Sequence, residues 1–310
     1  MDNKEKNFVS AVIYIRNNEN EIFDFLNGLN TILDDNFDRY EIICVNDYSE
    51  DNSINIVKDF CKDSNVNTLS IINMGHFHGI EFSMIAGIDL AIGDFVFEFG
   101  DVFMDFDIKT IMQTYYKCLE GFDIVAASPI CKEKLSSKLF YYILYINSNY
   151  ESKFLKEKFR VLSRRAINRV YSMNKTIYYR KAAYHNCGLK IAFIKYDVLK
   201  NYYKKNEKLL TDNRREIAID SLILFTDIAS RLSFFLSYFM IILAFMTLIY
   251  TIFVFINNKP VAGWTTTMLF LSIAFFGVFV IFSIIIKYLS ILVEFLFKKQ
   301  KYVIQDIERL

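Results

Sequence analysis

The sequence lacks an excess of charge of either sign. Its 310 residues include 36 lysines and arginines and 35 aspartates and glutamates, for a formal net charge of +1. Proteins that bind nucleic acids normally carry a strong basic excess. The composition therefore argues against a nucleic-acid partner, and the basic residues gather instead between Lys132 and Arg215.

The sequence also has no paired cysteine spacing, and its first residues do not have the pattern of a signal peptide. The five cysteines have no CxxC spacing, and their odd number is typical of reduced thiols in a cytosolic compartment. The opening MDNKEKNFVSAVIYI passes from charged to strand-like without the apolar segment and cleavage site of a signal peptide. We therefore expect the part of the chain before any membrane segment to be cytoplasmic.

Apolar residues, by contrast, exceed what one soluble core needs, at 53% hydrophobic and 17% aromatic. Residues 232–256 and 261–286 are free of charge and long enough to span a bilayer. The turn NNKPVAGW between them has a single charged residue, Lys259, whereas several basic residues flank the pair on both outer sides. This pattern predicts a transmembrane hairpin over residues 232–288 with its turn outside and both ends in the cytoplasm.

Before these runs, short apolar strands alternate with helical patterns. Strands are expected over residues 9–15, 40–45, 66–72 and 95–97, with helices beginning near residues 22, 54 and 80. Such alternation predicts an α/β fold with a mostly parallel sheet and right-handed crossovers. We interpret residues 1–127 as a doubly wound nucleotide-binding half.

An acidic cluster follows the strand at 95–97. Asp101, Asp105 and Asp107 lie where ligands bind in open α/β sheets, beyond the carboxyl end of a strand. Their hard oxygen atoms could hold a divalent cation (Mg²⁺ or Mn²⁺) that bridges phosphates. Aspartates in such a place also serve as loop solubilisers or helix caps, and the cluster alone does not decide between these readings.

Several motifs in order resemble one family. The segment VSAVIYIRNNENEI is similar to the opening strand and acidic turn of family 2 glycosyltransferases of the GT-A fold, and CVNDYSEDNS is similar to their second-strand motif. GIEFSMIAGIDLAIGDFVFEF resembles the helix and strand that lead to their Asp-x-Asp metal motif. With FRVLSRRAI, GLKIAFIKYD and the membrane hairpin, the likeness is strongest to membrane-anchored polyprenyl-phosphate glycosyltransferases, the bactoprenol glucosyltransferase and dolichol-phosphate mannose synthase group.

The resemblance implies a nucleotide site at the ends of the first two strands. The residues expected to form it are Tyr14, Arg16, Asn18, Glu19 and Asp47. The aspartate would accept hydrogen bonds from the base or ribose. Asn46 and Tyr48 replace an Asp and a Gly of the family pattern, which indicates a reshaped pocket.

The metal motif departs further from the family. Gly100-Asp101-Val102 stands where Asp-x-Asp is expected, so both family carboxylates are missing. Either Asp101 holds the cation by a one-residue shift, with Asp105 matching a downstream family aspartate, or metal-assisted transfer has been lost. His76 and His78 are too few to indicate a metal site.

The stretches at 132–149 and 154–172 are basic and amphipathic. Such helices either lie in a membrane interface or pack on the sheet as ordinary surface helices. The resemblance assigns Arg160 to the acceptor side, as a catalytic candidate beside Asp101 and Asp105. The basic juxtamembrane residues implied to meet the lipid phosphate are Lys208, Arg214 and Arg215.

The expected protein is an inverting glycosyltransferase of the bacterial inner membrane, with its catalytic domain in the cytoplasm. It would transfer a sugar from a UDP- or GDP-sugar to a polyprenyl phosphate. The expected division is a GT-A domain at 1–200 (halves 1–127 and 128–200), a juxtamembrane region at 201–231, the hairpin, and a cytoplasmic tail at 289–310. A scaffold that has lost activity and a transferase with another lipid-linked acceptor are the alternatives, and association with further copies of the chain is left open.

Overall fold

The computed structural model describes residues 4–64, 66–130, 157–173, 180–199 and 302–310, with scattered helical positions between 239 and 292. The chain divides into two units, one comprising Met1–Ala218 and Gln300–Leu310 and the other Ile219–Lys299. No helix among the described residues is both long and apolar enough to cross a membrane. Most of the expected hairpin, the stretch at 132–149 and the juxtamembrane residues Lys208, Arg214 and Arg215 lie outside the described residues.

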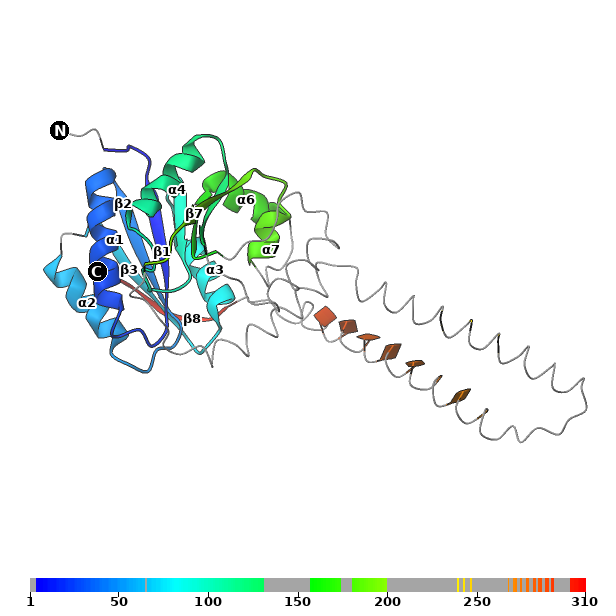
Figure 1. The fold of residues 1–310 in the computed structure, drawn as a ribbon. Helices are drawn as coiled ribbons and strands as arrows, with labels where there is room; N and C mark the ends of the chain where they lie inside the picture. The colour runs from blue at the N-terminus through cyan, green and yellow to red at the C-terminus, as the bar shows by residue number, and fades with distance from the viewer. Residues whose placement is uncertain are drawn as a thin grey trace, which may run out of the picture. The chain divides into compact units, whose positions relative to one another are not determined.

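A mixed β-sheet forms the centre of the first unit (Figure 1). In the described part of the chain the strand order is β7-β5-β6-β4-β1-β2-β3-β8. The strands are β1 (Val9–Ile15), β2 (Tyr40–Asn46), β3 (Leu69–Met74), β4 (Phe95–Phe99), β5 (Ile124–Pro129), β6 (Phe159–Ser163), β7 (Ile191–Tyr196) and β8 (Ile304–Arg309). β6 runs antiparallel to β4 and β5, and β8 runs antiparallel to β3; the remaining pairs are parallel.

Helices cover both faces of this sheet (Figure 1). One face packs against α1 (Ile22–Asn36), α2 (Ser53–Asp63) and α4 (Lys109–Leu119). The other packs against α3 (Ile80–Leu90), α6 (Arg164–Ser172) and α7 (Arg180–His185). Because successive side chains of a strand point to opposite faces, β1 places Val9, Ala11 and Ile13 in the first core and Val12 and Tyr14 in the second. This explains why the strands read as continuous apolar runs.

Two segments differ from the sequence-based expectations. Where an amphipathic helix was expected over 154–172, the described residues form strand β6 followed by α6, whose first turn is capped by the Ser163 hydroxyl accepting from the Ala166 N–H. Phe159, Val161 and Leu162 are fully buried between β4 and β5, a burial that the surrounding lysines and arginines concealed. The expected tail at 289–310 contains β8, whose mixed charged and apolar residues suit an edge strand.

Helix α3 lies unusually close to the sheet at Gly87. A methyl group added at this glycine would meet Val45 Cγ2 at 2.7 Å and Val12 Cγ1 closer still. Both neighbours are β-branched residues of the sheet and are stiff at χ1. The absence of a side chain at position 87 therefore sets how closely α3 packs on β1 and β2.

We predict that Gly87→Ala destabilises the protein by ~1–3 kcal/mol, the usual cost of overpacking a core. Gly28→Ala is the matched control, because it is also helical but its added methyl would meet the ends of Met104 and Ile108 at 3.2 Å. Both substitutions gain the same helix propensity. Thermal unfolding of the full chain should show a lower midpoint for Gly87→Ala than for Gly28→Ala; equal midpoints would refute the packing argument.

Candidate active site

The carboxyl ends of β1, β2 and β3 are joined by one buried carboxylate. Asp47, immediately after β2, has no exposed surface. Its Oδ2 accepts hydrogen bonds from the Tyr14 hydroxyl (2.9 Å) and the Gly79 N–H (2.9 Å), and its Oδ1 accepts from the His78 N–H (2.8 Å). Gly79 has φ +80°, a conformation that favours glycine, and it begins α3. Asp47 therefore fixes the loop between β3 and α3.

Arg16, at the end of β1, lies over this junction. Its Nη1 donates to the Asp47 carbonyl (2.7 Å) and is 3.4 Å from the Tyr48 carbonyl, and its guanidinium lies 4.0 Å from the centre of the Phe77 ring. Tyr48 has φ +57° and is 49% exposed, while Phe77 is 39% exposed. A cation and two accessible aromatic rings thus gather where β1, β2 and β3 end.

Asn18 and Glu19 connect the loop after β1 to the start of α2. The Asn18 N–H donates to the Ser53 hydroxyl (2.8 Å). The Glu19 N–H donates to Asp51 (3.0 Å), and the Glu19 carboxylate accepts from the Asn52 N–H (3.1 Å). The two residues predicted from the acidic turn therefore hold two loops together, next to Arg16.

Strand β8 supports the same loop from the C-terminal end of the chain. The Gly75 N–H donates to the Val303 carbonyl (2.9 Å), and the Val303 N–H donates to His78 Nε2 (3.0 Å). The His78 ring also stacks on His76, with ring centres 3.9 Å apart. The two histidines therefore order the loop, a role that sequence reasoning did not assign to them.

The acidic loop after β4 contacts a lysine. Lys158 Nζ lies 2.7 Å from Asp101 Oδ1 and 3.8 Å from Asp105 Oδ1. Asp105 also accepts from the Tyr196 hydroxyl (2.9 Å). Asp107 is separate, because its carboxylate accepts from the Lys109 N–H at the start of α4, one of the capping roles that the sequence allowed. The structure thus brings Asp101 and Asp105 together, but around an ammonium group.

Arg160 is part of a buried charge cluster on the α3, α6 and α7 face. Its Nε lies 3.3 Å from Glu98 Oε2, as does Arg180 Nη1, close enough for ion pairing but without hydrogen-bond geometry. Arg180 also pairs with Glu81 (3.0 Å), and the Tyr184 hydroxyl donates to Glu98 Oε1 (2.5 Å). Burial raises the pKa of Tyr184, so its phenol remains a donor.

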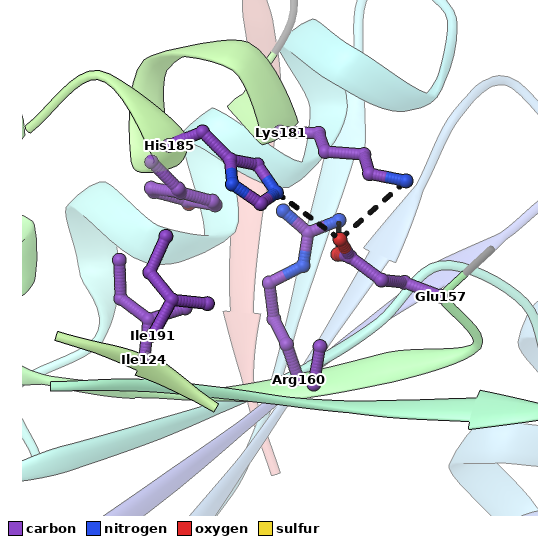
Figure 2. Close-up of a pocket in the computed structure, with 8 residues that line it drawn as sticks. Ile124, Glu157, Arg160, Lys181, His185 and Ile191 are labelled. Atoms are coloured by element: carbon purple, nitrogen blue, oxygen red, sulfur yellow. Dashed lines mark ion pairs between the residues drawn. The ribbon is translucent and has the colours of Figure 1, made fainter. Parts of the chain in front are cut away.

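Glu157 connects this cluster to α7. Figure 2 shows Lys181 and His185 converging with Arg160 on its carboxylate. Burial alone would raise the pKa of Glu157, but the cations of Lys181 and Arg160 outweigh it and hold that pKa below its usual range. Burial lowers the pKa of His185, although Glu157 opposes the shift. Arg160 Nη1 has no hydrogen-bond partner among the described residues.

Comparison with known proteins identifies the fold family. The sequence profile of glycosyl transferase family 2 matches residues 10–170, more than half of the chain. The chain belongs to glycosyl transferase family 2. The expectation from the sequence motifs is confirmed at this level, while membership of the polyprenyl-phosphate group stays a prediction.

Individual relatives of this family 2 chain are distant. An uncharacterized glycosyltransferase of Synechocystis sp. is 27% identical over 195 residues, which cover 61% of this chain and 60% of that relative. Glucosyl-3-phosphoglycerate synthase from Mycobacterium tuberculosis in complex with phosphoglyceric acid is 13% identical, covering 72% of this chain and 81% of that one, with a TM-score of 0.50. A structure of that synthase with Mn²⁺, UDP and phosphoglyceric acid gives a TM-score of 0.49 at 13% identity, over 70% and 76% of the chains.

The divalent cation implied by the family finds a poor set of ligands in this member. No group of three or more His, Cys, Asp or Glu side chains in the described parts of the chain could hold a metal. Gly100 and Val102 replace the family carboxylates, and Val102 is buried. Asp101 and Asp105 already contact Lys158. The described residues therefore do not fit a bound divalent cation.

The predicted site residues fall into three groups in this family 2 fold. Those expected to bind nucleotide come together at the ends of β1 and β2, although Asp47 is buried rather than facing a cleft. Asp101 and Asp105 lie beyond β4, and Arg160 lies in the buried cluster. Sequence reasoning missed Lys158, Glu157 and Arg180, whose basic or acidic neighbours made them look like surface charges.

We predict that Asp47→Ala destabilises the protein by about 2–5 kcal/mol, because it removes the acceptor of the buried Tyr14 O–H and of the part-buried His78 and Gly79 N–H groups, and each unsatisfied buried donor costs ~1–3 kcal/mol. Tyr14→Phe is the matched control, since it removes one of these donors and keeps the carboxylate; it should cost ~1 kcal/mol. Chemical denaturation of the full chain measures both free energies of unfolding. Wild-type stability in Asp47→Ala would show that the carboxylate does not hold the loop.

We also predict that stability falls as the pH drops below about 6.5, the ordinary pKa of histidine. The pKa of His185 is lowered in the folded state, so the unfolded chain takes up a proton first and is favoured by acid. His185→Gln should reduce this slope, by at most ~1.4 kcal/mol per pH unit. Unfolding midpoints between pH 7.5 and 5.5 test it; a variant with the wild-type slope would show that His185 does not titrate in this range.

Proposed function

We propose that this protein is an inverting glycosyltransferase that moves a sugar from a nucleotide-sugar donor to a membrane polyprenyl phosphate. The observation that carries the proposal is the junction of β1, β2 and β3 in a family 2 fold, where Arg16, Tyr48 and Phe77 surround loops held by Asp47. Ligands of open α/β sheets bind beyond the carboxyl ends of the strands. This junction is therefore the proposed donor site.

The exposed groups at the junction suit a nucleotide. Aromatic rings such as Phe77 and Tyr48 offer faces on which a nucleobase stacks. The guanidinium of Arg16 is already aligned by backbone carbonyls, so little side-chain entropy is lost when it contacts a base or phosphate. Asp47 acts indirectly, by holding the His78–Gly79 backbone that walls the site.

The proposed reaction is one displacement at the anomeric carbon of the sugar. An oxygen of the lipid phosphate forms the new bond, and the bond to the nucleoside diphosphate breaks, so that configuration inverts. Because the lipid phosphate is already ionised, no strong general base is required. The tasks of the protein are to orient both substrates and to stabilise the charge of the leaving diphosphate.

Membrane placement is part of the proposal and rests on the sequence. The two uncharged runs at 232–256 and 261–286 would form a hairpin whose ends lie in the cytoplasm. Lys208, Arg214 and Arg215 would then stand at the cytoplasmic face, where basic side chains attract lipid phosphates. A nucleotide-sugar from the cytoplasm and a lipid from the membrane would meet on that side.

A second candidate function is a scaffold that keeps the fold without catalysing transfer. Gly100 and Val102 favour it, because they stand at the two positions where the family carboxylates are expected. A transferase that acts on another lipid-linked acceptor is the third. The three candidates differ in whether label moves and into which product.

The test is to incubate membranes containing the protein with polyprenyl phosphate and radiolabelled UDP- and GDP-sugars. We expect label in an acid-labile lipid. Arg16→Gln should weaken donor nucleotide binding at least about fivefold, ~1 kcal/mol, whereas Arg39→Gln, an exposed arginine at the opposite end of β2, should not. Donor binding without transfer would favour the scaffold, and label in an acid-stable lipid would favour another acceptor.

A further inference from the structure

Lys158 lies at the carboxyl ends of β4 and β5 because it immediately precedes the antiparallel strand β6 between them. Its N–H donates to the Ala127 carbonyl (2.9 Å), which fixes the backbone. The side chain is only 14% exposed and reaches back to the loop after β4, where its Nζ contacts Asp101 (2.7 Å) and Asp105 (3.8 Å). The ammonium group is therefore built into the acidic loop.

Both carboxylates are oriented toward this lysine by further contacts. Asp101 Oδ1 also accepts from the Phe103 N–H (3.1 Å), and Asp105 Oδ1 from the Tyr196 hydroxyl (2.9 Å). Lys158 itself lies 5.8 Å from the centre of the Phe103 ring. The Oδ1 atom of each carboxylate is thus already engaged by the lysine and by a second donor.

A divalent cation could not share this place with the lysine at low cost. The ammonium group and a divalent ion held by the same carboxylates would repel each other, and the repulsion is twice that between two unit charges. A metal would therefore have to displace the ammonium group, and Gly100 and Val102 would offer it no carboxylate in return.

We propose that Lys158 is the resident cation of this acidic loop and excludes a divalent metal from it. An ammonium group has three N–H donors, so at least one remains beyond those facing Asp101 and Asp105. That donor is directed at the leaving diphosphate during transfer. The exclusion of metal stands on the geometry alone, whereas the contact with diphosphate rests on the proposed function.

The first measurement is Mn²⁺ binding to the full chain by electron paramagnetic resonance, with Mn²⁺ as the only ligand. Lys158→Met frees both carboxylates and should bind Mn²⁺ at least about tenfold more tightly than the wild type. Lys158→Arg keeps the charge and should bind no better than the wild type. The double variant Lys158→Met with Asp101→Asn should lose the gained affinity, which places the new site.

Two results would overturn the exclusion of metal: equal Mn²⁺ affinity in the wild type and Lys158→Met, or a wild-type site that Asp101→Asn removes. The Mn²⁺ measurement uses no sugar donor, so it tests the exclusion of metal even if the protein has no glycosyltransferase activity. The second measurement is the affinity for UDP and GDP in excess chelator, where we expect Lys158→Met to weaken binding and Lys158→Arg to retain it. Nucleotide binding by the wild type that requires Mn²⁺ would refute the role at the diphosphate.

Discussion

The donor side of this molecule depends on a carboxylate that no solvent reaches. Asp47 has three hydrogen-bond donors around it, from Tyr14 on β1 and from the His78–Gly79 backbone after β3. Burying an ionised carboxylate is costly unless such bonds compensate it. The same bonds connect the ends of β1 and β2 to the loop after β3. Arg16 and the Phe77 ring beside it therefore lie on backbone that Asp47 holds in place.

The buried charge cluster on the α3, α6 and α7 face requires more electrostatic compensation than Asp47 does. Glu81, Glu98 and Glu157 lie among Arg160, Arg180 and Lys181, all with little exposure. The mutual attraction of buried ion pairs offsets the free-energy cost of their desolvation only when the charges balance and are well oriented. Three acids and three bases balance here, since burial favours neutral His185. Arg160 Nη1 and Arg180 Nη1 both lack a hydrogen-bond partner among the described residues, although Arg180 Nη1 forms an ion pair with Glu98.

The sequence predicted the regular half of the fold well. The strands at 9–15 and 40–45 and the helices after them were visible because both faces of each strand are buried, which produces uninterrupted apolar runs. β6 was mistaken for a helix because it is only five residues long and is followed directly by α6, a basic helix of strong amphipathic character. Strand β8 was missed because an edge strand needs no apolar alternation.

The candidate site was predicted by position more than by contact. Residues at strand ends could be named because topology places them at one edge of the sheet. What each touches depends on segments distant in sequence: Lys158 reaches Asp101 across 57 positions, and Val303 reaches His78 across 225. Such pairings leave no local signature. The buried state of Asp47 was likewise invisible, because a turn aspartate has the same sequence context whether it faces water or a backbone loop.

Strand β8 also sets an order of events during synthesis. Asn73 of β3 hydrogen-bonds to Asp306 of β8, a partner made 233 residues later. Domains generally fold from the N-terminal side as the chain emerges, so β3 is an open edge while the second unit, Ile219–Lys299, is being made. Unpaired edges invite pairing with other chains. The nascent protein therefore passes through a stage in which β3, the strand that leads into the donor loop, has an unpaired edge, and this stage ends when β8 is made and pairs with it.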